Sequence, residues 1–260
     1  MAAIDTQVSL QHRYRGCVTD SLFAPLRECA QVIGEAIKGH RGRGFSGERP
    51  TQYHLDVVAD EVALRILLGA GFRVVSEESG VSGSGELTVV VDPIDGSTNC
   101  DRGVPFYATS LAVLRGDELV AGLVRNQATG AVFEAEKGAG ATRDGQSIRT
   151  SGLRDFSKAL VGFSGRPDRN IGWYQTRSMG AASLEICLVA DGSLDGYAVA
   201  QQSTLNPWDY LAGLLISREA GGVDADYRGE ELVTSDNVVR RPVFGATTEI
   251  LRPLLEAGSL

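Results

Sequence analysis

The chain has 260 residues, 43% of them hydrophobic, which is enough for a well-filled core and excludes a disordered or fibrous protein. It carries 25 Lys and Arg against 33 Asp and Glu, and the net charge of -8 makes a nucleic-acid backbone a poor partner. No window approaches the ~18 consecutive apolar residues of a membrane span, and residues 1–16 are polar. We therefore expect a cytoplasmic protein that binds neither nucleic acid nor membrane.

The four cysteines and three histidines form no metal-binding or disulfide pattern. The cysteines lie far apart without a CxxC pair, and we expect reduced thiols at Cys17, Cys29, Cys100 and Cys187. The histidines are few and gather near the N-terminus, at His12, His40 and His54. Any bound metal should therefore have oxygen ligands.

The predicted elements begin with two helices, over residues 21–38 and roughly 57–68. The stretch between them, residues 40–52, is basic and glycine-rich, which predicts a mobile loop. Short β-like runs separated by turn residues follow at 72–76, 87–92, 107–115, 119–125 and 131–136. Meandering antiparallel strands are the simplest interpretation of these runs.

The second half of the chain predicts an alternation of helix and strand. A glycine-punctuated hairpin over residues 138–148 is followed by strands and helices at 160–163, 181–190, 194–199, 208–220 and 247–255. The pattern indicates α+β layers in one domain over residues 1–260, with subdomains at about 17–150 and 151–260. The chain shows no internal repeat.

The strongest chemical signal is residues 89–99, VVVDPIDGSTN, where an apolar strand runs into two acids. Pro93 cannot extend the strand, so the chain turns and Asp95 can approach Asp92. Two facing carboxylates are unfavourable unless a cation neutralises them, and Mg²⁺ suits such ligands. The following Gly96, Ser97 and Thr98 offer backbone N–H groups and hydroxyls of the kind that hold phosphate.

Each of these residues also has a purely structural interpretation. Asp92 can simply start a turn, and Ser97 or Thr98 can simply cap a short helix. Six such residues within eight positions after a buried strand nevertheless favour a functional site.

Two further acidic motifs have ambiguous roles when taken alone. In VSEESG, Glu77 and Glu78 follow an apolar run and point to opposite sides, so one of them can join the Asp92 site. In NPWDYLAGLLISREAGG, Asn206 caps a helix and Asp209 lies in its first turn, where favourable interaction with the helix dipole explains it without a ligand.

Another pair of acids lies at the start of the second predicted helix. Asp56 and Asp60, in LDVVADE, are four residues apart and share one helix face. Either of them can serve simply as an acidic residue near a helix N-terminus.

Taken together, VSEESG, DPIDGSTN and NPWDYLAGLLISREAGG resemble the three signatures of the inositol monophosphatase family in order and separation. GAGATRDGQSI and RSMGAASLEICLVADGSLDGY also resemble that family, so about the first fifteen residues alone fall outside the likeness. The resemblance implies a layered αβαβα sandwich of the inositol monophosphatase and fructose bisphosphatase type, a homodimer, and a Mg²⁺-dependent, lithium-sensitive phosphatase.

The resemblance also implies roles for individual residues. Glu77, Asp92 and the carbonyl of Ile94 would hold one Mg²⁺, and Asp92, Asp95 and Asp209 a second. Glu77 would also help to hold a third, weaker Mg²⁺ through water. The implied phosphate and substrate contacts are Asp95, Gly96, Ser97, Thr98, Gly180 and Ala181.

Asp60 and Ser97 would orient the attacking water, with serine in place of the family's usual threonine. The implied reaction is in-line attack of a metal-activated water on a phosphate monoester, without a covalent intermediate.

The substrate is less defined than the chemistry. Inositol monophosphate is the default, although residues 199–202 contain no acid where inositol-binding members carry one. Histidinol phosphate, a sugar phosphate or a 3′-phosphonucleotide are alternatives, and a nucleotide would need arginines such as Arg125, Arg166, Arg169 and Arg177. A catalytically silent binding or regulatory protein is the non-enzyme alternative, but such a protein would be expected to lack one of the metal acids.

Overall fold

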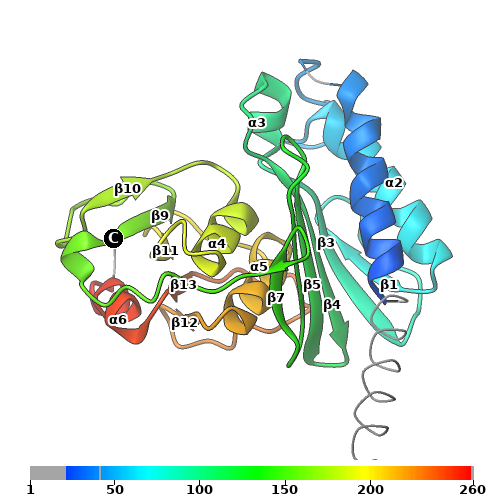
Figure 1. Cartoon of the computed structure of the whole chain (residues 1–260). Coiled ribbons are helices and arrows are strands. Elements are labelled where there is room, and N and C mark those ends of the chain that lie inside the picture. Colours follow the sequence, from blue (N-terminus) through cyan, green and yellow to red (C-terminus); the bar gives the residue numbers. More distant parts are fainter. Residues whose placement is uncertain (1–21, 41, 259–260) are drawn as a thin grey trace, which may run out of the picture.

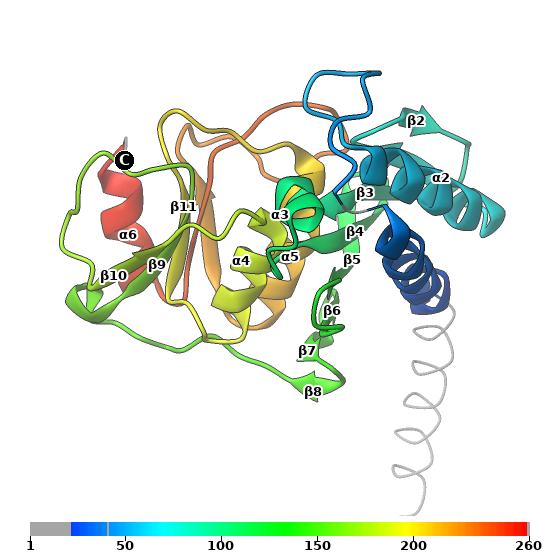
Figure 2. The ribbon, with the colours of Figure 1, turned by 90° about the horizontal axis from the view of Figure 1, so that it is seen from above.

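Two β-sheets and three layers of helices alternate in the computed structural model, which describes residues 22–40 and 42–258 (Figures 1 and 2). A helix over residues 22–36 and α2 (His54–Gly69) cover the outer face of the first sheet. Helices α4 (Ala182–Ala190) and α5 (Pro207–Glu219) lie between the sheets, and α6 (Thr248–Glu256) covers the far side of the second. The predicted layered αβαβα sandwich is confirmed. Cys17 and His12 lie outside the described residues.

The first sheet has eight strands in the order β2-β1-β3-β4-β5-β6-β7-β8. Their bounds are β1 Arg73–Ser76, β2 Gly80–Ser82, β3 Leu87–Asp95, β4 Ala108–Arg115, β5 Glu118–Asn126, β6 Val132–Glu136, β7 Gly140–Arg143 and β8 Gln146–Ser147. The short connections from β3 to β8 produce the expected antiparallel pairing, including the β7–β8 hairpin. The prediction was wrong for β1 and β3, which are parallel. The hairpin partner of β1 is instead β2, a short strand that no sequence pattern indicates.

The second sheet has five strands in the order β10-β9-β11-β13-β12. Their bounds are β9 Leu160–Ser164, β10 Gln175–Arg177, β11 Gly196–Val199, β12 Val223–Asp226 and β13 Pro242–Gly245. β9 pairs in parallel with both β10 and β11, while β13 runs antiparallel to β11 and β12. The chain passes from β10 into α4 and from β11 into α5.

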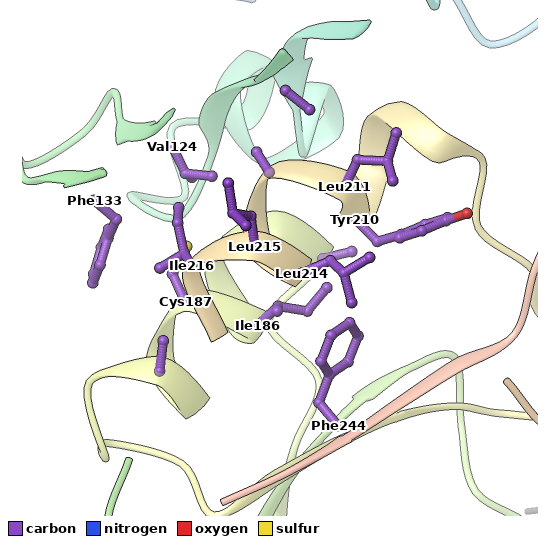
Figure 3. Close-up of a cluster of buried hydrophobic side chains, with 14 of the residues drawn as sticks. Val124, Phe133, Ile186, Cys187, Tyr210, Leu211, Leu214, Leu215, Ile216 and Phe244 are labelled. Carbon is purple, nitrogen blue, oxygen red and sulfur yellow. The ribbon is translucent and has the colours of Figure 1, made fainter. Parts of the chain in front are cut away.

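Helix α5 joins the two sheets through the largest hydrophobic core. Figure 3 shows its leucines between Val124 and Phe133 of the first sheet and Phe244 of the second. Leu211 and Leu214 are fully buried, and each such side chain contributes about 1.5–3 kcal/mol relative to an exposed one. Because α5 is packed from both sides, its N-terminal turn is held in a fixed place beside the first sheet.

The remaining short helices are η1 (Ile37–Gly39), α3 (Ser97–Arg102) and η2 (Phe156–Lys158). The cysteines of the described part, Cys29, Cys100 and Cys187, are buried and form no disulfide with one another. Among the described residues there is no helix with the length and apolar character needed to cross a membrane.

Candidate active site

The parallel pairing of β1 with β3 brings Glu77 and Asp92 together. Ser76 is the register partner of Val91, and the N–H of Glu77 donates to the Val91 carbonyl at 3.2 Å. The next residues along the two segments therefore lie side by side, and they are the two acids: Glu77 directly after β1 and Asp92 within β3. The antiparallel arrangement expected from the sequence would have placed them at opposite ends.

Asp209 reaches the same point from α5. It occupies the third position of the helix, where one carboxylate oxygen accepts the N–H of the N-cap residue Asn206 at 2.7 Å. The Ser110 hydroxyl, on β4, donates to the Trp208 carbonyl at 2.9 Å and ties this turn to the first sheet. Asp209 thus serves the helix cap and still places a carboxylate oxygen within 4.8 Å of those of Glu77 and Asp92.

This acidic cluster is electrostatically unfavourable without a cation. Burial first, and then the charges of Glu77, Asp95 and Asp209, raise the pKa of Asp92 well above its ordinary value. Loss of hydration and the neighbouring charge of Glu78 raise the pKa of Glu77 to about 7. Oδ1 of Asp92 is buried and has no hydrogen-bond partner. A hard divalent cation that takes oxygen ligands would give the unpartnered oxygen a contact and would neutralise the repulsion between the carboxylates.

Asp95 lies next to this cluster but faces α4. Its carboxylate accepts the N–H of Ala182 at 3.1 Å, the N–H of Ser183 at 2.7 Å and the Ser183 hydroxyl at 2.5 Å. Burial raises the pKa of Asp95 to about 6, against the lowering effect of these hydrogen bonds. Oδ1 accepts a single one of them, so it keeps a lone pair for a further contact. Asp95 therefore links the cluster to the first turn of α4.

Gly96 brings the predicted phosphate turn against the residues before α4. Its φ of +87° favours glycine, and a Cβ there would lie 2.9 Å from the Gly180 oxygen and 3.2 Å from the Ala181 Cβ. The Asn99 side chain donates to the Met179 carbonyl at 2.7 Å, which fixes the approach to α4. The structure thus brings together Gly96, Gly180 and Ala181, which are far apart in the sequence.

The hydroxyl of Ser97 pairs with Asp56, whereas Asp60 has a different hydroxyl partner. A side-chain hydrogen bond joins Ser97 to Asp56, whose pKa burial raises to about 7. Asp60 instead accepts the Ser76 hydroxyl at 2.5 Å. The reason is the start of α2, which begins at His54 rather than near residue 57, so that Asp56 lies in its first turn. Asp60 is one turn further along the helix.

A cavity of about 510 Å³ opens over this site. Its lining residues come from the segment before α2 and the first turn of α2, the two residues after β1, the start of α3, the start of α5 and a distant loop: Arg49, Pro50, Thr51, Gln52, Tyr53, Asp56, Glu77, Glu78, Ser97, Thr98, Asn206, Trp208 and Asn237. Thr98 lies at this cavity, where its hydroxyl pairs with that of Tyr53 at 3.0 Å. Ile94 is buried directly before Asp95. Glu77 is exposed, so the cluster is reachable from solvent.

Several positioning residues were missed by sequence reasoning. Asn99, Ser110 and Tyr53 act through hydrogen bonds to distant segments, and nothing in their local sequence marks those contacts. Asp56 had a signal, because an acid three residues after a helix start is typical of a capping box.

A model of the inositol monophosphatase family matches residues 19–256. The chain belongs to this family. The fructose-1,6-bisphosphatase/inositol-1-monophosphatase of Archaeoglobus fulgidus is 36% identical over 239 residues, covering 89% of each chain. A putative Nus factor SuhB of Neisseria meningitidis is 35% identical, covering 65% of this chain and 71% of that one. A solved inositol monophosphatase-fructose 1,6 bisphosphatase superimposes with a TM-score of 0.80 at 28% identity, covering 90% of this chain and 98% of that one.

Proposed function

We propose that this family member is a Mg²⁺-dependent phosphomonoesterase that hydrolyses a small phosphorylated alcohol. The supporting observation is the partnerless Oδ1 of Asp92, buried among the carboxylates of Glu77 and Asp209 within 4.8 Å. A merely structural acid would be expected to have a hydrogen-bond donor there. All ligand atoms of the cluster are oxygens. Mg²⁺ prefers oxygen ligands, whereas softer metals prefer sulfur or nitrogen.

Glu77, Asp92 and Asp209 would hold the cation, with the Ile94 carbonyl and Asp95 as further ligands. The bound ion would supply positive charge that polarises the phosphate and favours ionisation of the attacking water. The number of ions stays a prediction, as do the homodimer and the sensitivity to lithium.

The remaining residues act on the phosphate and on the water. Gly96 and Ser97 would offer backbone N–H groups to the phosphate, and Asp95 would hold α4 against this turn through Ala182 and Ser183. Ser97 Oγ would take a proton from the attacking water as its own proton passes to the Asp56 carboxylate. In this proposal Asp56 takes the role that the sequence assigned to Asp60.

The surroundings of the cavity favour a small substrate over a nucleotide. Arg125 lines a separate cavity beside the helix over residues 22–36, and Arg49 is the single arginine among the described lining residues of the metal-site cavity. Residues 199–202, where inositol-binding members carry an acid, have none here. In this stretch the side-chain amide of Gln202 donates to both carboxylate oxygens of Asp168, at 3.2 and 3.3 Å. Inositol monophosphate is our default substrate, with sugar phosphates and histidinol phosphate next.

The test is a turnover screen with excess MgCl₂ over inositol 1-phosphate, fructose 1,6-bisphosphate, histidinol phosphate and 3′-phosphoadenosine 5′-phosphate. We expect phosphate release from one of the first three at a far higher kcat/KM than from the nucleotide. Absence of release from the whole panel would favour the catalytically silent alternative. Preference for the nucleotide would refute the argument from the arginines.

A further inference from the structure

The segment just before α2 forms a closed loop that lines the metal-site cavity. We call residues 44–53 the pocket loop. An antiparallel bridge pairs Phe45 with Tyr53, and the N–H of Ser46 donates to the Gln52 carbonyl at 2.7 Å. The base of the loop is held by Asp101 on α3, which accepts the N–H of Gly44 at 3.2 Å. The sequence predicted a mobile segment here, yet these contacts give the loop a defined conformation.

The pocket loop is fastened to the first sheet through a single carboxylate. Oε2 of Glu78 accepts hydrogen bonds from Nη2 of Arg49 and from Nε2 of Gln52, the latter at 2.5 Å. The Glu78 side chain is 10% exposed and Gln52 is 8% exposed. The Gln52 amide oxygen in turn accepts the Ser46 hydroxyl at 2.8 Å, which extends the network across the loop. Arg49 is 45% exposed, so the buried Gln52 amide is the better shielded of the two partners of Glu78.

Glu78 directly follows Glu77, and the two side chains have different partners. Glu77 joins the carboxylate cluster with Asp92, whereas the polar contacts of Glu78 go to the pocket loop. Both residues line the cavity, together with Arg49 and Gln52. The end of β1 therefore holds the cation site on one side and the loop that encloses the cavity on the other.

The pocket loop carries backbone strain that needs such an anchor. Thr51 has a φ of +65°, in the left-handed region that is unfavourable for a β-branched residue. A strained residue keeps its conformation when the surrounding contacts determine it. Here the contacts are those of Gln52 and Arg49, on either side of the turn.

We propose that Glu78 is a positioning residue that latches the pocket loop, through Arg49 and Gln52, as the wall of the substrate cavity. This inference rests on the proposed phosphatase function and adds a determinant of substrate affinity. Glu78 contributes no atom to the group of carboxylates that can hold a cation. Its role is to keep the cavity in the shape that encloses the substrate, so its loss should affect KM more than kcat.

The experiment compares Glu78→Ala, Arg49→Ala, their double variant and Glu78→Gln in the full-length protein. A matched control is Arg27→Ala, because the Arg27–Glu134 ion pair has similar exposure, 48% and 15% against 45% and 10% for Arg49–Glu78, and lies outside the metal-site cavity. Steady-state kinetics with para-nitrophenyl phosphate give kcat, KM and the Mg²⁺ concentration for half activity. Hydrogen exchange of residues 44–53 reports on the loop without reference to activity.

We expect Arg49→Ala to raise KM about tenfold, the loss of one charge-assisted hydrogen bond, and Glu78→Ala, which also loses the contact with Gln52, to raise it at least as much, with kcat within a few-fold in both variants. The double variant should be no worse than Glu78→Ala alone, because Glu78→Ala already removes the contact that Arg49→Ala breaks. Exchange in residues 44–53 should accelerate in all three, and Glu78→Gln should recover part of the protection because its amide oxygen still accepts. Arg27→Ala should match the wild type.

The proposed role of Glu78 is refuted if Glu78→Ala leaves the rate of hydrogen exchange in residues 44–53 unchanged. It is equally refuted if that variant lowers kcat and weakens Mg²⁺ dependence at constant KM, since Glu78 would then act on the cation site. Absence of activity in the wild type would instead contradict the proposed function, and the exchange data would still decide whether the latch exists.

Discussion

Replacing Asp209 by Asn should separate the stability of the metal-free protein from its activity. Burial and the charges of Glu77 and Asp95 raise the pKa of Asp209 well above its ordinary value, so ionisation at neutral pH is unfavourable. Asn has the same shape, and its amide oxygen can still accept the N–H of Asn206. The variant therefore loses the repulsion and a cation ligand but keeps the helix cap.

The expected gain follows from two opposing effects. The neutral side chain avoids the repulsion of the neighbouring carboxylates, which together with burial raises the pKa of Asp209. Loss of a negative charge at the N-terminus of α5 costs about 0.3–1 kcal/mol. Because the pKa of Asp209 is raised well above its ordinary value, the first effect exceeds the second, and Tm in EDTA should rise by about 2–4 °C for each kcal/mol of net gain in a chain of this size.

In excess MgCl₂ the wild type should instead have the higher Tm, because cation binding stabilises the wild type and not the variant. The assay is thermal unfolding of both proteins in EDTA and in MgCl₂ at neutral pH, together with phosphate release. Asp226→Asn is a matched control, since Asp226 is also buried and accepts the N–H groups of Arg228 and Arg241, each at 2.7 Å. Because Asp226 lies outside the cluster, the Asp226→Asn substitution should lower Tm in both buffers.

The reasoning would be refuted if Asp209→Asn lowered Tm in EDTA as much as Asp226→Asn does. It would also be refuted if the Asp209 variant kept its rate of phosphate release. Asp209 would then serve the helix cap alone.

Three further expectations concern pH, the water-orienting pair and the phosphate turn. Since the pKa values of Glu77 and Asp56 are raised to about 7 in the folded protein, the native state binds more protons than the unfolded one. The free energy of unfolding in EDTA should therefore fall as pH rises from about 4 to about 8, and urea unfolding showing an increase would contradict this. Ser97→Ala and Asp56→Asn should each lower kcat about 10²-fold or more with little change in Tm, whereas loss of stability with kcat retained would indicate a capping role. Gly96→Ala should destabilise more than Gly138→Ala in urea unfolding, because both have positive φ but a Cβ at Gly96 alone would lie 2.9 Å from a backbone oxygen; equal losses would contradict the close contact.

The layered fold could be predicted because the motifs resemble a known family and because most elements have clear local signals. The helix from Pro207 begins with Asn206 and Pro207 and buries a regular apolar face, so its start was predicted within one residue. The parallel pairing of β1 with β3 could not be predicted in the same way. It depends on β2, whose three residues Gly80–Ser82 are largely exposed and carry little hydrophobic pattern.

The carboxylate cluster could be anticipated because each acid directly follows an apolar strand or a helix cap. The partner of Ser97 could not, since Asp56 and Asp60 share one helix face and the choice depends on where α2 begins. Tyr53 as N-cap lacks the usual signal of Ser, Thr, Asp or Asn, which hid the first turn of the helix. Long-range contacts such as Glu78 with Gln52 leave no trace in either local sequence.

We propose that Glu77, Asp92 and Asp209 bind a divalent cation that the phosphatase reaction requires. The most direct measurement is phosphate release by chelator-stripped protein as MgCl₂ is titrated back, for the wild type and for Asp92→Asn. We expect no release from the stripped wild type, recovery on saturating addition of Mg²⁺, and none from the variant at any Mg²⁺ concentration. Full activity of the stripped wild type, or recovery of Asp92→Asn to the wild-type rate, would contradict the account.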